Sequence, residues 1–431
     1  MEKMDYKQVI IQWKEFSQPL VFPRQAIVNI DLDLVTTITG PRRAGKTYFC
    51  FQLIQKILQQ GISANNVLYI NFEDNRLLGA TAQDLDKLYE TFLEISEVQQ
   101  KQAIYLFFDE IQVVQNWDAW VRKMYDQHRN IRLIITGSSS TLLSREISTK
   151  LRGRVLNWEI FPLRFKELVQ WNKLPYNVKT LTQSKDRIAI KKLFNQYAIR
   201  GGYPLLYAQK QVPAETLLQN YYESMIFKDV VERHRIEDVK KLKSLAQLLF
   251  QSVSKELSYT QLSNKLSSMG FAISKNTVIE YIHHFEDAYL FFQNLKYEYS
   301  LAKQMGSIKK IYCIDNGLLN AVSFKFSEDL GRALENVVFI ELRQRQQNIY
   351  YHRLKHECDF IIVHQNKVVS AIQVAATLDD QNMSRELKGL LEAMVVHKLK
   401  EGIIITNDQE EERNVEGKLI KIIPIWKWLL T

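Results

Sequence analysis

The sequence predicts an α/β protein whose N-terminal part is built on a parallel sheet, and three observations support this prediction. Four short apolar runs between residues 34 and 136 alternate with amphipathic stretches of helical length, the pattern of a parallel sheet covered by helices. A glycine-bearing turn, Gly40 to Thr47, follows the first run, and the third run ends in Asp109 and Glu110. Together they predict a phosphate-binding loop at the carboxyl edge of the sheet.

The chain has 431 residues, which is enough for two or three domains. Its 46% hydrophobic and 24% charged residues are ordinary for a globular protein. No apolar run approaches the roughly 18 residues of a membrane-spanning helix, and residues 1–16 lack a signal-peptide core. The three cysteines, Cys50, Cys313 and Cys358, are far apart. These features disfavour a disulfide framework or a cysteine zinc cluster and predict a cytoplasmic protein.

The first predicted strand, Leu34–Thr39, leads directly into a P-loop. Residues 40–47 read Gly-x-x-x-x-Gly-Lys-Thr, and a helix is predicted from Lys46 to about Gln59. Glycines let backbone N–H groups approach phosphate oxygens, and the start of the helix favours an anion. We expect Lys46 to reach the β- and γ-phosphates and the Thr47 hydroxyl to bind Mg²⁺. The expected nucleotide-binding residues are Gly40, Pro41, Arg42, Arg43, Ala44, Gly45, Lys46, Thr47 and Tyr48.

The third predicted strand, Ile104–Phe108, ends in a second P-loop-enzyme motif. Its apolar residues carry Asp109 to the carboxyl edge of the sheet, where open α/β sheets bind ligands. We expect Asp109 to hold Mg²⁺ through its water shell and Glu110 to polarise a water for in-line attack on the γ-phosphate. The Asp-Glu pair is typical of hydrolysing ATPases of this branch, and the guanine-reading Asn-Lys-x-Asp sequence is absent. ATP is therefore expected rather than GTP. The alternative is a solvated strand end.

The second and fourth predicted strands are Val67–Phe72 and Arg132–Thr136, and a hydroxyl-rich stretch lies at the end of the fourth. Thr136 or Ser138 there can sense the γ-phosphate or the attacking water. The same Ser/Gly stretch can instead cap the next helix. Both interpretations stay open.

Four arginines have two interpretations each. Arg152 and Arg154 are candidate arginine fingers, acting in their own subunit or across an interface. Arg42 and Arg43, inside the loop, can assist the phosphates or contact a neighbouring subunit. All four can also be ordinary surface charge.

Further segments follow these motifs in a definite order. The series is Gly-Pro-Arg-Arg-x-Gly-Lys-Thr, Phe-Phe-Asp-Glu-Ile-Gln, Thr-Gly-Ser-Ser-Ser, Leu-Arg-Gly-Arg and Phe-Pro-Leu-Arg-Phe-Lys-Glu, then Gly-Gly-Tyr-Pro and Tyr-Glu-Ser-Met-Ile-Phe-Lys-Asp. It resembles the prokaryotic AAA-type ATPases related to the archaeal ATPase group, and the resemblance covers nearly the whole chain. It implies an ATPase core over residues 1–163, a helical lid over 164–240, a winged helix over 241–326 and a restriction-endonuclease-like domain over 327–431.

Residues 241–326 also predict a winged helix by their own pattern. A turn at 269–271 precedes a third amphipathic helix, Lys275–Ala288, and strands at Leu290–Leu295 and Lys309–Ile314 are expected to pair around a tip at 303–306. Residues 233–310 carry 12 Lys/Arg and 7 Asp/Glu in a chain of net charge +9, which suits double-stranded DNA. The expected DNA contacts are Lys275, Asn276, Thr277, Lys303, Lys309 and Lys310. Acidic residues on the same helix, Glu280, Glu286 and Asp287, keep protein docking open as the alternative.

The last predicted domain keeps only part of a nuclease site. Restriction-endonuclease folds hold Mg²⁺ with an Asp and a Glu-x-Lys on adjacent strands; Asp359 matches the Asp, and Glu335 matches an acidic position on the first helix. Where Glu-x-Lys is expected, the chain has Gln373-Val374-Ala375. An amide is a poorer Mg²⁺ ligand than a carboxylate, and Ala375 cannot polarise water. We therefore predict a scaffold for DNA, a partner or self-association, without DNA cleavage.

The motifs combined predict a Mg²⁺-dependent ATPase whose hydrolysis cycle drives or gates a tail that acts on DNA. The alternative is an ATP-dependent conformational switch or scaffold with a protein partner. A homo-oligomer is compatible with both, because an arginine supplied to a neighbouring subunit requires assembly.

Overall fold

The computed structural model describes residues 5–431 except 27, 139–152, 210 and 324–328. The chain forms two compact units, Met1–Phe161 and Pro162–Thr431. No helix in the described part of the chain combines the length and the apolar character needed to cross a membrane.

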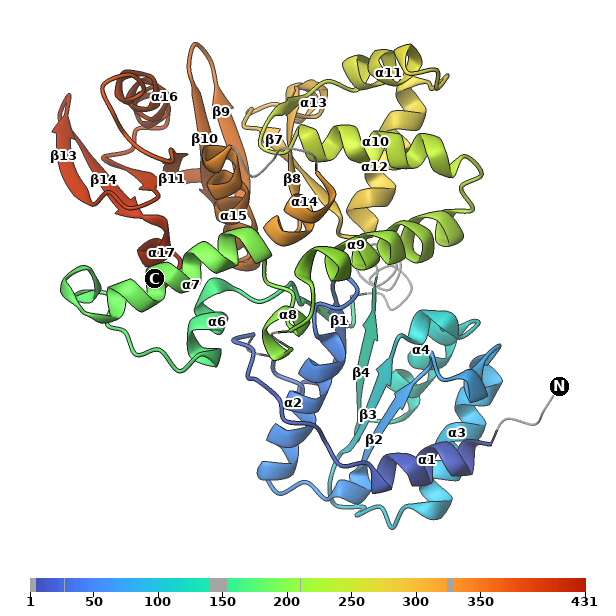
Figure 1. The fold of residues 1–431 in the computed structure, drawn as a ribbon. Coiled ribbons are helices and arrows are strands. Elements are labelled where there is room, and N and C mark those ends of the chain that lie inside the picture. The colour runs from blue at the N-terminus through green and yellow to red at the C-terminus, as the bar shows by residue number, and fades with distance from the viewer. Residues whose placement is uncertain (1–4, 27, 139–152, 210, 324–328) are drawn as a thin grey trace. The chain divides into compact units, whose positions relative to one another are not determined.

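The first unit is built on a five-stranded parallel sheet of order β2-β3-β4-β1-β5 (Figure 1). Its strands are β1 (Val35–Thr39), β2 (Val67–Asn71), β3 (Ile104–Asp109), β4 (Ile131–Gly137) and β5 (Val155–Glu159). Its helices are α1 (Tyr6–Glu15), α2 (Lys46–Gln59), α3 (Ala82–Ile95) and α4 (Trp117–Gln127), with 3₁₀ turns η1 (Ala64–Asn66), η2 (Asn75–Leu77) and η3 (Ile111–Val113). The four predicted strands are confirmed, whereas β5, which pairs with β1, was not predicted.

Both faces of this sheet are buried. Alternate residues of β3 enter different cores: Leu106 and Phe108 pack in a cluster with residues of α3 and α4, and Tyr105 and Phe107 pack in one with residues of α2. Strands buried on both faces read as continuous apolar runs, which explains why the sequence revealed them. Because β3, β4 and β1 are neighbours, the loops that leave their carboxyl ends meet at one edge.

The second unit contains a mixed nine-stranded sheet of order β13-β14-β12-β11-β10-β9-β7-β8-β6 (Figure 1). Its strands are β6 (Glu256–Leu257), β7 (Phe291–Lys296), β8 (Lys309–Cys313), β9 (Asn348–Arg353), β10 (Glu357–His364), β11 (Lys367–Val374), β12 (Glu401–Thr406), β13 (Glu411–Val415) and β14 (Lys418–Pro424). The β7–β8 pair is antiparallel, as expected. Parallel pairing of β7 with β9 then joins the strands expected in the winged helix to those of the C-terminal domain.

Helices precede and cover this sheet. They are α6 (Phe165–Trp171), α7 (Asp186–Arg200), α8 (Leu205–Ala208), α9 (Ala214–Ser224), the π-helix η6 (Met225–Glu232), α10 (Val239–Gln251), α11 (Tyr259–Ser268), α12 (Lys275–Asp287), α13 (Leu301–Gly306), α14 (Asn316–Val322), α15 (Leu330–Gln344), α16 (Met383–Val396) and α17 (Ile425–Trp428), with a 3₁₀ turn η5 (Leu181–Gln183). The expected tip at 303–306 is wrong in form, because these residues end the helix α13.

A buried aspartate clamps the Gly-Gly-Tyr-Pro break after α7. Asp315 accepts hydrogen bonds from the Gly202 N–H at 2.6 Å and the Leu318 N–H at 3.0 Å. Gly201 has φ +74°, and a Cβ there would lie 1.9 Å from Asp315 Oδ1. Burial raises the pKa of the Asp315 carboxyl to about 6, although the backbone donors oppose the shift.

This raised pKa predicts a pH-dependent contribution to stability. The folded-state value of about 6 exceeds the unfolded value, so the contribution is fully present below about pH 4 and is lost as the pH rises through 6, by about 3 kcal/mol. When the pH is lowered from 7.5 to 4, we expect the unfolding free energy of wild type to rise by up to that amount relative to that of Asp315→Asn. Urea unfolding measures it, with the exposed Asp380→Asn as control. A difference that is constant with pH would contradict the assignment.

Candidate active site

The P-loop adopts the tight turn that its glycines predict. Gly40 has φ +145°, and a Cβ at this position would lie 2.0 Å from the Ile160 carbonyl oxygen. Gly45 has φ +100° and caps α2, which begins at Lys46. Arg43 also has a positive φ, +65°. Only a residue without a side chain fits at position 40, so the backbone of the loop is fixed directly against the strand end at Ile160.

Lys46 is buried at the start of α2. Its Nζ donates to the carbonyl oxygens of Gly40 at 3.1 Å and Pro41 at 3.2 Å, and it lies 3.5 Å from Glu110 Oε1. The amine is therefore held over the loop and beside the acidic strand end. This is the position from which the lysine of a P-loop contacts phosphate oxygens.

Three hydroxyl groups converge on the Asp109 carboxylate. Thr47 Oγ1 and Tyr69 OH each donate to Asp109 Oδ2 at 2.7 Å, and Thr136 Oγ1 donates to Oδ1. Burial, and then the neighbouring Glu110, raise the pKa of Asp109 in spite of these donors. A cation beside the carboxylate would oppose this shift, and carboxylate and hydroxyl oxygens are ligands that Mg²⁺ accepts.

Glu110 is held ionised next to Lys46. Its backbone has φ +53°, and its N–H donates to Thr136 Oγ1 at 3.0 Å. Its Oε2 accepts from Gln112 Nε2 at 2.6 Å. Burial alone would raise the pKa of Glu110, but Lys46 and Gln112 outweigh burial and lower it. A carboxylate without a proton at neutral pH is the form that a general base requires.

The other residues predicted for this site in the first unit differ in where their side chains lie. Thr136 lies at the centre of the site, and Ser138 is buried immediately after β4. Arg42 pairs with Glu73 at 3.0 Å, and the Tyr48 side chain is largely exposed. Arg152 lies outside the described residues.

Arg154 lies at the opposite edge of the sheet from the P-loop. It directly precedes β5, and its carbonyl oxygen accepts from the Val35 N–H at the start of β1. Its guanidinium pairs with Asp126 and lies 5.1 Å from the Tyr125 ring centroid. Because β1 separates this edge from the loop by the length of a strand, the expectation that Arg154 acts on phosphates of its own subunit is wrong.

Two side chains that the sequence did not reveal support the site. Tyr69, on β2, supplies one of the donors to Asp109. Arg24, in the segment before β1, donates to the carbonyl oxygens of Ala44 at 3.0 Å and Phe161 at 2.8 Å and so braces the loop. Neither residue belongs to a local motif; only the pairing of β2 with β3 brings Tyr69 to Asp109.

The expected DNA-contact residues separate into exposed and buried groups. Lys275 and Asn276 are exposed at the start of α12, Thr277 is half-buried there, and Lys303 is exposed on α13. The expectation for the other two is corrected. Lys309 is buried, and its Nζ donates to the Met305 and Ser307 carbonyl oxygens at 3.0 and 3.2 Å.

Lys310 lies at the centre of an acidic cluster in the second unit. Its buried Nζ is 2.9 Å from Glu335 Oε1, 2.7 Å from Glu357 Oε1 and 2.9 Å from Asp359 Oδ1. Burial would lower the pKa of Lys310, but the surrounding acidic groups, Asp359 first and then Glu335, together outweigh burial and raise it. This amine is enclosed by carboxylates and cannot contact a DNA phosphate, so its predicted role is wrong.

Two residues of the expected partial nuclease motif, Glu335 and Asp359, contact the same lysine. Gln373 Nε2 donates to Glu386 Oε2 at 2.7 Å, and the Val374 N–H donates to Asp359 Oδ2 at 2.9 Å. A cleft of about 710 Å³ opens beside Glu335, Asp359 and Gln373. The ammonium of Lys310 compensates the charge of the carboxylates around it.

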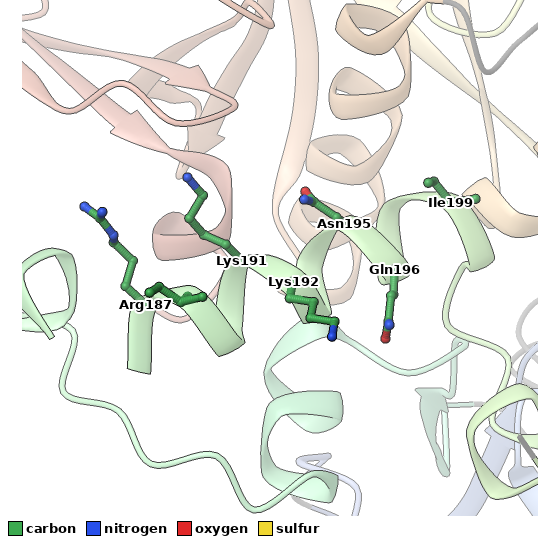
Figure 2. Close-up of a pocket in the computed structure, with 7 residues that line it drawn as sticks. Arg187, Lys191, Lys192, Asn195, Gln196 and Ile199 are labelled. Carbon is green, nitrogen blue, oxygen red and sulfur yellow. The ribbon is translucent and has the colours of Figure 1, made fainter. Parts of the chain in front are cut away.

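A second hollow, of about 460 Å³, follows one side of α7. Figure 2 shows its side chains, which all come from that helix and include the basic residues Arg187, Lys191 and Lys192. Lys191 pairs with Asp408 at 2.5 Å. None of the candidate residues in the described chain lines this hollow.

Family models match three consecutive parts of the chain. Residues 33–169 match an AAA domain, residues 191–330 match a domain of unknown function, DUF8612, and residues 330–428 match another, DUF4143. The whole chain is 37% identical to the uncharacterized protein MJ1544 of Methanocaldococcus jannaschii, and 96% of that protein is covered. The chain belongs to the same family as MJ1544. An uncharacterized protein of Haemophilus influenzae is 30% identical over 94% of this chain and 97% of its own length.

The AAA match confirms the coarse part of the predicted resemblance. It spans the P-loop, the Asp109–Glu110 pair and Thr136, and AAA domains generally bind ATP and Mg²⁺. Solved structures are similar only distantly. The Orc1 protein of Aeropyrum pernix in complex with DNA is 12% identical, with 75% of this chain and 90% of that chain covered and a TM-score of 0.27. AMPPCP-bound DnaA of Aquifex aeolicus is 16% identical, with coverages of 60% and 83% and a TM-score of 0.24. TM-scores this low support no functional argument for this chain.

Proposed function

We propose that this protein is a Mg²⁺-dependent ATPase of the prokaryotic AAA type related to the archaeal ATPase group. The observation that carries the proposal is the convergence of Lys46, Thr47, Asp109, Glu110 and Thr136 at one edge of the parallel sheet. Lys46 neutralises phosphate charge, Glu110 takes the proton of the attacking water, and Thr136 connects Glu110 to Asp109. Thr47 and Asp109 hold Mg²⁺, which neutralises charge on the phosphate oxygens.

We further propose that the second unit acts on double-stranded DNA through a winged helix. Three helices, α10, α11 and α12, and a sheet of β7, β8 and β6 support this interpretation. Ser274 Oγ accepts from the Thr277 N–H at 3.0 Å and so caps α12, which leaves Lys275 and Asn276 exposed at its first turn. These residues and Lys303 remain the proposed DNA contacts.

The C-terminal strands are proposed to form a restriction-endonuclease-like domain that does not cut DNA. Gln373 and Ala375 occupy the positions of a metal-binding carboxylate and a catalytic lysine, and Lys310 already pairs with Glu335 and Asp359. Its ammonium adds to the argument from sequence, because a lysine placed between two carboxylates competes with a divalent cation for them.

A protein-binding switch is the second candidate, and one observation favours it. The segment between β7 and β8 exposes large apolar side chains, with Tyr299 at 86%, Leu301 at 72% and Met305 at 61% exposure. Exposed apolar side chains of this kind are better suited to contact another protein than the charged backbone of DNA. In this alternative ATP sets the conformation and turnover is slow. Assembly of several copies, with Arg152 or Arg154 acting on a neighbouring subunit, is compatible with either function.

Measuring ATP turnover with and without duplex DNA distinguishes the DNA-acting ATPase from the protein-binding switch. We expect duplex to stimulate hydrolysis, and binding of duplex to fall steeply with salt. The double variant Lys275→Glu/Lys303→Glu is expected to reduce the slope of log affinity against log salt by about 2. Lys367→Glu, at an exposed lysine of β11, is the charge control. Slow turnover that ignores duplex, with no duplex binding at low salt, would instead support the switch.

A further inference from the structure

Two histidines and an aspartate come together between separate helices of the second unit. His234 lies two residues beyond the π-helix η6, and His284 and Asp287 lie in the last turn of α12. One possible ligand atom from each residue lies within 4.8 Å of the other two. None of the three takes part in the proposed ATPase site or in the expected DNA contacts.

The two imidazoles contact each other closely. Their ring centroids are 3.7 Å apart, with the planes inclined by 18°. His234 Nε2 is enclosed and has no hydrogen-bond partner among the described residues, which is unfavourable for a buried polar atom. Glu280 Oε1 lies 3.7 Å from His284 Nε2. This distance is beyond that of a hydrogen bond, so Glu280 would have to move closer to act as the carboxylate that orients a metal-binding histidine.

We propose that His234, His284 and Asp287 form a binding site for a transition-metal dication, with Zn²⁺ as the best fit. Imidazole ligands select Zn²⁺, Co²⁺ or Ni²⁺ over Mg²⁺ and Ca²⁺, which prefer oxygen ligands throughout. Three protein ligands leave a fourth tetrahedral position for water or another donor.

Binding requires a modest rearrangement of side chains. Ligand atoms at the usual distances from Zn²⁺ lie about 3.3 Å apart, so the separation of up to 4.8 Å has to close by about 1.5 Å. All three residues are only half-buried, which leaves their side chains room to rotate. The two imidazole rings leave their stacked arrangement and turn toward the ion, and either Nε2 or Nδ1 of His234 becomes a ligand.

The bound ion would connect η6 to α12. π-helices are rare and often mark functional sites, and the η6 segment leads directly to His234. The metal would fix the end of α12 that lies opposite Lys275 and Asn276. The proposal itself depends only on the three ligands and stands apart from the ATPase assignment.

Zinc titration of the full-length protein tests the site. We expect one equivalent of Zn²⁺ to bind by calorimetry, and Co²⁺ to give the visible absorption of a tetrahedral ion. His234→Ala and His284→Ala should each weaken binding by at least about 100-fold. The matched control is His283→Ala, which removes the adjacent, exposed histidine that pairs with Glu286 at 3.2 Å.

The thermal midpoint of each variant, measured with and without Zn²⁺, separates metal loss from misfolding. Wild type and His283→Ala should gain stability from Zn²⁺, and Asp287→Asn should gain less. The proposal is wrong if wild type shows no saturable Zn²⁺ binding. It is also wrong if the His234 and His284 variants, folded as judged by circular dichroism, bind as tightly as wild type, or if His283→Ala loses as much affinity as they do.

Discussion

Replacing Glu110 by glutamine is expected to lower steady-state ATP hydrolysis by about 10²- to 10⁴-fold while ATP still binds. An amide of nearly the same shape cannot accept the proton of the attacking water. The loss should fall on kcat rather than on ATP binding, because the variant leaves the loop in place. Lys46 lies 3.5 Å from Glu110 but also donates to the carbonyl oxygens of Gly40 and Pro41, which hold it over the loop. ATP calorimetry and phosphate release, measured on the same preparation, separate binding from turnover.

The matched control for this prediction is Glu73→Gln. Glu73 is another acid beside the loop, but it is half-exposed and pairs with Arg42 at 3.0 Å. We expect Glu73→Gln to turn over at close to the wild-type rate. If Glu110→Gln hydrolyses ATP as fast as wild type, Glu110 is not the general base. If wild type binds neither ATP nor GTP with Mg²⁺, the whole assignment of the site fails.

Replacing Lys310 by methionine should destabilise the second unit by about 3–5 kcal/mol. The ammonium of Lys310 lies within 2.9 Å of carboxylates from Glu335, Glu357 and Asp359. Methionine fills a similar volume but leaves the buried Glu335 and Asp359, and the partly exposed Glu357, without a cation. Burial, and then Asp359, already raise the pKa of Glu335 with the lysine present, so the variant should offset part of its loss of stability by taking up protons. Urea unfolding at pH 8.5 and pH 5.5 is expected to show the larger loss at the higher pH.

Lys309→Met is the neighbouring control. Its Nζ donates to two backbone carbonyl oxygens rather than to acids, so a loss of about 1–2 kcal/mol is expected. The double variant Lys310→Met/Glu335→Gln should be less destabilised than Lys310→Met alone, because it removes one of the uncompensated charges. If Lys309→Met and Lys310→Met proved equally stable, the acidic cluster would not need its lysine.

The first unit was predictable because its signals are local. The strand, loop and helix around Gly40–Thr47 are consecutive in sequence, and Asp109 directly follows an apolar strand. Tyr69 and Arg24 carry no such signal, since strand pairing and loop packing place them. Arg154 was misjudged because a sequence does not show at which edge of a sheet a residue lies; the parallel pairing of β5 with β1 decides it.

In the second unit the helix α12 and the strands β7 and β8 were recognisable from the sequence, but the roles of their side chains were not. Lys309 and Lys310 look like surface charges because nothing nearby in the sequence neutralises Lys310. Its partners come from α15 and β10, 25 and 49 residues further along the chain. The helix α13 was missed because Gly306 ends it and reads equally well as the tip of a hairpin.

The pairing of β7 with β9 has a consequence for how this chain can be divided. Leu295 and Lys296 lie opposite Tyr350 and Tyr351, and the Tyr297 N–H donates to the Tyr351 carbonyl oxygen at 2.8 Å. A fragment that stops before α15 would leave the β7 edge with unpaired N–H and C=O groups. Such an edge is a template for another strand. Fragments cut there would thus tend to aggregate, and an intact sheet is what keeps this surface from recruiting other chains.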